Sequence, residues 1–252
     1  MRLKLIRLDN FYQNMSDPQV GLNFLEMSLI RSKGYGPEYS SGYLPLDASD
    51  FICWHYLLYL ESEDGWVPIS CWRHTSLNRC DYYRVVPPFL NTVKEADVHP
   101  HLEALEALIS NCRLTHQELI YLGGLTILKS FRVDRELSND VKEVVIATAY
   151  QEQQSRQCTL LSGGAMKFKT HLVLEKAGLE PLSWQGVSLP PFEKKSAFGA
   201  PMIVMALREG FSQWGKECFR KHSLLLQNIV HIGGAALPEV QEAVKKEDKK
   251  AA

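Results

Sequence analysis

The stretch that decides the fold spans residues 118–182 and contains two consecutive segments, Leu119-Ile-Tyr-Leu-Gly-Gly-Leu-Thr-Ile-Leu128 and Phe131-Arg-Val-Asp-Arg-Glu-Leu-Ser-Asn139. The first segment is apolar and has the composition of a buried strand. The second has the composition of a turn, and Asp140 with Glu143 three residues later has the form of a helix N-cap. The sequence therefore predicts a strand, a turn over 135–139 and a helix N-terminus that together suit an anion.

The rest of this stretch repeats the alternation of strand and helix. Cys158-Thr-Leu-Leu161 has the composition of a short buried strand, and Gly163-Gly164 is expected to end it. Apolar residues at helical spacing then lead to Gly178, which has the position of a C-cap glycine.

Outside this stretch, the pattern predicts a first strand over 1–9, a helix within 14–33 and a β-hairpin from 51–60 and 66–75. A helix is expected after Pro100, a further strand over 199–207, and one long or two short helices beyond it. Residues 34–43 form a loop with three tyrosines. They could cover a ligand or simply pack against the body of the protein.

Charge and cysteine usage restrict the class of protein. There are 28 basic and 29 acidic residues, so the net charge of -1 gives no global reason to expect nucleic acid as a partner. The six cysteines stand singly, which suits reduced thiols in a cytoplasmic protein. No segment has the roughly 20 apolar residues of a membrane span.

Three short segments resemble the GCN5-related N-acetyltransferase (GNAT) superfamily. Leu174-Glu-Lys-Ala-Gly-Leu-Glu-Pro181 is similar to the closing helix of that fold, and Phe131-Arg-Val-Asp134 to the end of its central strand. Arg135-Glu-Leu-Ser-Asn-Asp140 stands where the superfamily has its pyrophosphate loop. The resemblance implies an α/β (α+β) fold over 1–208, with a mixed, mostly antiparallel twisted sheet flanked by helices. A C-terminal helical extension over 209–238 and a charged, flexible tail over 239–252 would follow.

Within the superfamily, the nearest likeness is to the acyl-homoserine-lactone synthase and N-acyl amino acid synthase branch. Leu46-Asp-Ala-Ser-Asp50, His55-Tyr-Leu57, Cys71-Trp-Arg73 and Phe131-Arg-Val-Asp134 follow the order of the motifs of that branch. This resemblance implies direct transfer of an acyl group from acyl-CoA, or from acyl carrier protein, to a small-molecule amine or amino acid.

The sequence also departs from the family pattern. Ser138 and Asp140 replace the two small residues of the pyrophosphate loop, and Ile127 and Ser130 replace a glutamate and an arginine of the synthase branch. The alternative function is therefore a non-catalytic protein with a GNAT fold that binds a ligand or a protein partner.

The resemblance assigns roles to particular residues. The backbone of Phe131, Arg132 and Val133 would pair with the pantetheine arm and polarise the thioester carbonyl. Pyrophosphate contacts would come from Arg135, Ser138 and Asn139.

Direct transfer also needs a base for the amine and an acid for the leaving thiolate. Candidate bases are His55 and Lys129, and candidate acids are Tyr121 and Tyr150.

A metal site is the competing chemistry. His99-Pro-His101 with Cys112 and His116 supplies suitable ligand types, and Cys71 with His74 adds a pair. These spacings match no tight zinc pattern, so no metal is expected. Acyl-CoA is the co-substrate that the resemblance implies. The C-terminal helices are expected to provide either a homodimer surface or a cap on the sheet.

Overall fold

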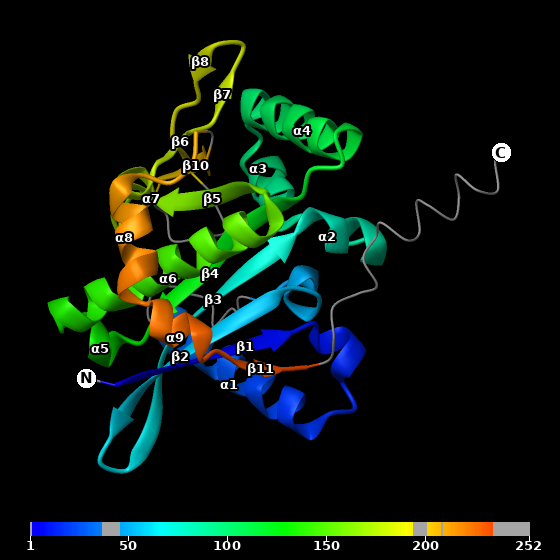
Figure 1. Ribbon diagram of the computed structural model, residues 1–252. Coiled ribbons are helices and arrows are strands. Elements are labelled where there is room, and N and C mark those ends of the chain that lie inside the picture. The colour runs from blue at the N-terminus through cyan, green and yellow to red at the C-terminus, as the bar shows by residue number, and fades with distance from the viewer. Residues whose placement is uncertain (1, 37–45, 194–200, 208, 234–252) are drawn as a thin grey trace.

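The computed structural model describes residues 2–36, 46–193, 201–207 and 209–233. Most of the predicted tyrosine-rich loop and the predicted charged tail lie outside these residues. Within them, nine strands form one sheet in the order β11-β1-β2-β3-β4-β5-β10-β6, and β9 pairs with β10 (Figure 1). The pairs β4–β5 and β1–β11 are parallel and the other pairs are antiparallel. The predicted mixed, mostly antiparallel sheet is confirmed.

The sheet strands have the following bounds: β1 Leu3–Asp9, β2 Trp54–Ser62, β3 Gly65–Ser76, β4 Leu119–Ile127, β5 Thr159–Ala165, β6 Leu179–Pro181, β9 Phe192–Glu193, β10 Pro201–Leu207 and β11 Val230–Ile232. A separate two-stranded sheet joins β7 (Ser183–Trp184) to β8 (Val187–Ser188). The predicted hairpin is the antiparallel pair β2 and β3.

Helices cover both faces of the sheet (Figure 1). One face carries α1 (Pro18–Tyr35), α3 (Pro88–Ala96) and α4 (His99–Leu114), which pack on residues such as Cys71 and Leu161. The other face carries α6 (Arg135–Arg156), α7 (Thr170–Ala177), α8 (Gln213–Lys221) and α9 (Ser223–Gln227), which pack on residues such as Trp72 and Leu160. Neighbouring residues of a strand point to opposite faces of the sheet. Because helices cover both faces, the residues on both faces are apolar. Four short helices complete the described elements: η1 Phe11–Asn14, η2 Ala48–Phe51, α2 Leu77–Tyr83 and α5 Lys129–Arg132.

The helix after β4 begins earlier than the sequence predicts. Asp134, and not Asp140, is the N-cap of α6, because its backbone is extended and its carboxylate accepts the N–H of Leu137. The expected turn over 135–139 is therefore the start of the helix itself.

The end of the central strand is also misplaced in the sequence prediction. β4 ends at Ile127, and α5 (Lys129–Arg132) follows as one helical turn. The N–H groups of Phe131 and Arg132 both donate to the carbonyl of Leu128, at 2.9 and 3.2 Å. The expectation that the backbone of 131–133 belongs to a splayed strand is thus wrong, since α5 occupies this stretch and local helical hydrogen bonds occupy the N–H groups of Phe131 and Arg132.

The elements after β10, namely α8, α9 and β11, pack against earlier parts of the domain. α8 packs on α6, and β11 pairs with the β1 edge, aligning Ile6 with Val230. None of the helices among the described residues has the length and apolar composition that a membrane crossing requires.

Candidate functional site

The central feature of the sheet is the divergence of the two parallel strands β4 and β5. They pair only from Leu119 with Thr159 to Leu122 with Ser162, although β4 continues to Ile127 and β5 to Ala165. Past these pairs, β5 has no further pairing with β4 but stays paired with β10 as far as Ala165. A wedge therefore opens between two strands of one sheet.

A bulge in β4 accompanies this divergence. Cys71 of β3 pairs with Thr126 and Arg73 pairs with Gly123, so Gly124 and Leu125 together face one residue of β3. Gly124 has a φ of +66°, and a Cβ there would lie 2.7 Å from Nη2 of Arg31. Glycine is required at this position on both counts, and the bulge bends the strand.

A cavity of about 440 Å³ occupies the wedge. Arg73 and its neighbour Trp72 both line it although they point to opposite faces, so the cavity is bounded by side chains from both faces of the sheet. Gly163, Met202 and Tyr121 meet in the lining of the cavity, and a Cβ on Gly163 would lie 2.6 Å from Cε of Met202 and 3.2 Å from the hydroxyl oxygen of Tyr121.

On the α1 face, the cavity meets a buried ion-pair cluster. The carboxylate oxygen Oδ1 of Asp50 lies 2.6 Å from Nη1 of Arg31 and 2.5 Å from Nη1 of Arg73. Arg73 also donates to Asp47 at 2.7 Å, and Asp50 accepts the backbone N–H of Asp47 at 2.8 Å. The side chains of Arg31, Asp47 and Arg73 line the cavity.

The electrostatic effect of this cluster is to keep its carboxylates ionised. Burial alone would raise the pKa of Asp50, but the guanidinium groups of Arg31 and Arg73 hold that pKa well below its usual range. Burial also acts to raise the pKa of Asp47, and Arg73 reverses the shift, so the net direction is down. The cavity therefore has a fixed negative charge beside two fixed positive charges.

Two tyrosines also line this part of the cavity. Tyr35 donates to the carbonyl of Leu125 at 2.8 Å, and the Tyr121 ring packs against Phe89 with 5.4 Å between centroids. Burial raises the pKa of Tyr35 and of Tyr121, so both phenols stay protonated near neutral pH. Of the two acids expected from the sequence, Tyr121 lies at the cavity.

The α6 face of the cavity combines polar and apolar groups. Ser138 and Lys142 lie one helical turn apart on α6 and both line the cavity, together with Val145 and Leu174. Arg132 lines it too, and it donates to the carbonyls of Ile127 and Gly34 at 2.6 and 2.8 Å.

Two of the six predicted cofactor residues thus line the cavity, namely Arg132 and Ser138. The other four do not line it: Phe131 is half-buried, and Val133, Arg135 and Asn139 are exposed. Sequence analysis missed Lys142, although its spacing of four from Ser138 places both on one side of a helix.

The three predicted catalytic residues are not brought together. Lys129 is exposed on α5, and Tyr150 on α6 packs against the rings of Phe211 and Phe219. His55 is buried beneath η2 and does not line the cavity.

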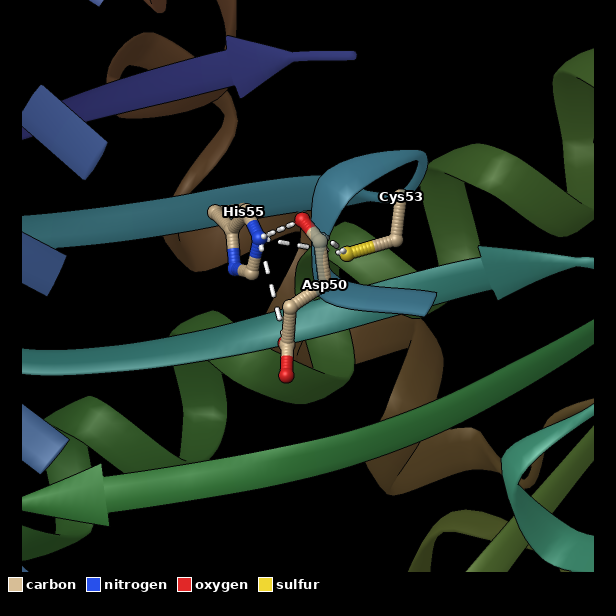
Figure 2. Close-up of side chains that lie close together, drawn as sticks. All are labelled: Asp50, Cys53 and His55. Atoms are coloured by element: carbon tan, nitrogen blue, oxygen red, sulfur yellow. Dashed lines mark hydrogen bonds and ion pairs between the residues drawn. The ribbon is translucent and has the colours of Figure 1, made fainter. Parts of the chain in front are cut away.

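Asp50, Cys53 and His55 converge in the buried cluster (Figure 2). His55 Nε2 lies 2.7 Å from the backbone oxygen of Asp50 and 3.3 Å from Cys53 Sγ. Burial lowers the pKa of His55 to about 3 and raises that of Cys53, so the imidazole is neutral and the thiol keeps its proton. With Asp50 already neutralised by Arg31 and Arg73, these groups fit a hydrogen-bonded core cluster and not a metal site.

The alternative metal ligands from the sequence are not assembled among the described residues. The two groups of potential ligands found there contain none of them. His101 Nε2 lies 2.9 Å from the carbonyl of Pro190, and His99 is exposed beside Asp97.

Comparison with known proteins places this geometry in context. No known family profile and no curated protein sequence matches the chain. Among solved structures, the CoA-dependent acyl-homoserine lactone synthase BjaI, with SAM and isopentyl-CoA, superposes with a TM-score of 0.50 at 11% identity, covering 97% of this chain and 100% of that chain. The chain has the GNAT fold.

Further GNAT-fold structures match less closely. The acyl-homoserine lactone synthase LasI has a TM-score of 0.48 at 12% identity, over 93% of this chain and 98% of that one. FeeM, an N-acyl amino acid synthase from uncultured soil microbes, has a TM-score of 0.45 at 13% identity, over 84% and 93%. The BjaI superposition confirms the predicted GNAT-like fold.

Proposed function

We propose that the chain is an acyltransferase that moves an acyl group from a thioester carrier to an amine in the cavity between β4 and β5. The observation that carries this proposal is the wedge itself, where the strands part after Leu122 and Ser162 and side chains of both faces reach one space. Two substrates can enter such a space from opposite faces and meet at the gap.

The carrier arm fits the α6 side of the wedge. An extended chain with amide groups, such as pantetheine, can hydrogen-bond to a strand edge that lacks a neighbouring strand. Lys142 and Arg132 would then face the carrier phosphates, with Arg135 and Asn139 nearby on the first turn of α6. Because Asp134 caps this helix, the phosphates would depend on side chains more than on free backbone N–H groups.

The acceptor fits the charged face. The ionised carboxylate of Asp47 suits an ammonium group, and the guanidinium groups of Arg31 and Arg73 suit an acceptor that also carries a carboxylate. An amino acid or a related small amine is therefore the proposed acceptor. BjaI was solved with SAM and isopentyl-CoA, which supports a CoA-type donor and a small-molecule co-substrate.

The proposed reaction is a direct transfer. The bound ammonium first gives one proton to water, and the resulting neutral amine attacks the thioester carbonyl carbon, so that a C–N bond forms and the C–S bond breaks. The attacking nitrogen gives its second proton to water, the thiolate takes a proton from the phenol of Tyr121, and Tyr121 regains a proton from water. Attack at a preformed gap between two bound substrates lowers the entropic part of the barrier.

The test is a binding titration of the chain with CoA, acetyl-CoA and medium-chain acyl-CoAs, followed by thermal unfolding and calorimetry. A ligand at one hundred times its dissociation constant stabilises the fold by about 2.7 kcal/mol. Gly163→Leu should abolish this stabilisation because the new side chain would displace Met202 and Tyr121 in the lining of the cavity. Gly21→Ala is the matched control, since a Cβ at Gly21 has no atom within 4 Å.

Release of free thiol in the presence of amino acids and other small amines then separates catalysis from binding. Binding without thiol release would favour the non-catalytic alternative. Absence of binding to any acyl-CoA and to phosphopantetheinylated acyl carrier protein would refute the proposal. A cytoplasmic location and a homodimer through α8 and α9 stay predictions, and light scattering of the purified chain tests the second.

A further inference from the structure

A second polar cluster lies away from the cavity, where the junction of α8 and α9 meets α6. Lys221 Nζ lies 2.7 Å from Oδ1 of Asp140 and 2.6 Å from Oε2 of Glu143. His222, the next residue, places Nε2 3.4 Å from the same oxygen of Glu143. The three potential ligand atoms of Asp140, Glu143 and His222 all lie within 4.8 Å of one another.

His222 is the unusual member of this cluster. Its side chain is only 8% exposed, and among the described residues its Nε2 makes no well-aligned hydrogen bond, although the Glu143 oxygen lies 3.4 Å away. A buried ring nitrogen without a well-aligned hydrogen bond is costly, and a cation placed between it and the carboxylate would satisfy both groups.

The separations suit a metal ion. With metal–ligand bonds of about 2.05 Å, two ligands of a tetrahedral zinc ion are about 3.3 Å apart. The Nε2 of His222 and Oε2 of Glu143 are 3.4 Å apart. Lys221 shows, in addition, that a positive charge is stable between the two carboxylates, and its side chain is 55% exposed and can swing into solvent.

We propose that Asp140, Glu143 and His222 bind a divalent transition-metal ion of the Zn²⁺ type, and that the Lys221 ammonium holds the site when no metal is bound. One imidazole and two carboxylates are a ligand set for borderline metals, with water as the fourth ligand. The ion would tie the α8–α9 junction to α6, the helix whose Ser138 and Lys142 line the cavity. Its role is structural, because none of its three ligands lines the cavity.

The test uses the full chain after treatment with a chelator and dialysis. Zn²⁺ is titrated by calorimetry, and Co²⁺ is titrated by visible absorption, which reports directly on tetrahedral coordination. His222→Gln should weaken Zn²⁺ binding by at least about 100-fold, since loss of an outer-shell partner alone costs 10- to 100-fold. His99→Gln is the control for adventitious histidine binding, because His99 is exposed and should leave the affinity unchanged.

Lys221→Ala provides a test of opposite sign. Removal of the competing ammonium should tighten Zn²⁺ binding by about three- to tenfold, the effect of one like charge at short range. If the cluster were only an ion-pair network, Lys221→Ala would not raise the affinity.

Asp140→Asn is a second ligand variant in case His222→Gln fails to fold, with circular dichroism as the check on folding. Equal Zn²⁺ affinity in the wild type, in Asp140→Asn and in His222→Gln would overturn the proposal. The proposal would also be overturned if His99→Gln weakened Zn²⁺ binding as much as His222→Gln did, because exposed histidines would then account for the binding.

Discussion

Two clusters of charged side chains lie on opposite faces of the sheet, and they differ above all in exposure. In the first, Arg31 and Asp50 are 1% and 0% exposed and Arg73 is nearly as buried. In the second, Asp140 and Glu143 are 16% and 21% exposed and their partner, the lysine of α8, is 55% exposed. A buried ion pair cannot lose one member without leaving an uncompensated charge, whereas an exposed pair can exchange its cation. The first cluster is suited to shape a rigid cavity wall, and the second is suited to bind a replaceable ion.

The largest expected effect is in the buried cluster. Asp50→Asn should lower the free energy of unfolding by about 3–5 kcal/mol, because the buried Arg31 would lose its carboxylate partner and the buried Arg73 would keep only Asp47. Urea unfolding at pH 7 measures it, with Asp97→Asn at an exposed site as the control. A loss below about 1 kcal/mol would mean that the arginines find other acceptors and that the contrast between the clusters is small.

Acid sensitivity extends the comparison to the buried histidines. Burial lowers the pKa of His55 to about 3 and that of His74 to about 4, whereas both titrate near 6.5 in the unfolded chain. The unfolded state therefore binds more protons below pH 6.5, and stability falls as pH falls. Each histidine should cost about 1.4 kcal/mol at pH 5.5 relative to pH 7.5.

Urea unfolding at the two pH values measures this loss, and His74→Leu should remove about half of it. Retention of the full loss in that variant would assign the acid sensitivity to other groups. His99→Gln, at an exposed histidine, is the control substitution.

A third network lies between the two extremes. Tyr56 donates to the buried carboxylate of Glu152 at 2.8 Å, and that carboxylate is also paired with the partly exposed Arg7 and Arg156. Tyr56→Phe should cost about 1.5–3 kcal/mol, the usual range for a hydrogen bond to a charged group. Thermal and urea unfolding measure it against Tyr12→Phe, an exposed control. An effect as small as that of the control would place this network with the exposed cluster.

The smallest effect is expected in the exposed cluster. With metal removed by a chelator, Lys221→Ala should cost less than about 1 kcal/mol, and the difference should shrink as salt is added. Urea unfolding at low and high ionic strength measures both quantities. A loss comparable to that of Asp50→Asn would show that exposure does not separate the two clusters.

Sequence periodicity was a sound guide to the elements whose packing is local in the chain. The predicted hairpin is β2 and β3, and helices lie where apolar residues recur at helical spacing, as in α1 and α4. The ends of strands and helices were less predictable, because they depend on which neighbouring strand or helix the fold places beside them. Gly163-Gly164 was expected to end a strand, but β5 continues to Ala165 because β10 pairs with it from a position about 40 residues away.

The cavity had one signal that sequence analysis did not use. Gly123-Gly124 lies inside an apolar strand, where glycine often marks a bulge or a close approach of another group. Arg31 had a signal too, since it continues the spacing of the buried Val20, Phe24 and Met27 on one face of α1. A basic residue on an apolar helix face indicates a buried partner but does not identify it.

The sequence by itself determined the order of most of the longer strands and helices up to β10, the apolar faces of those elements and the GNAT-like arrangement that they imply. These properties follow from side-chain periodicity and from backbone hydrogen bonds between residues close in the chain. Only the tertiary structure decided where β4 and β5 part and which charges meet. Arg31 finds Asp50 19 residues away, and Lys221 finds Asp140 81 residues away. The free energy of such contacts depends on burial and on partners brought together by the fold, and neither is encoded in any local stretch of sequence.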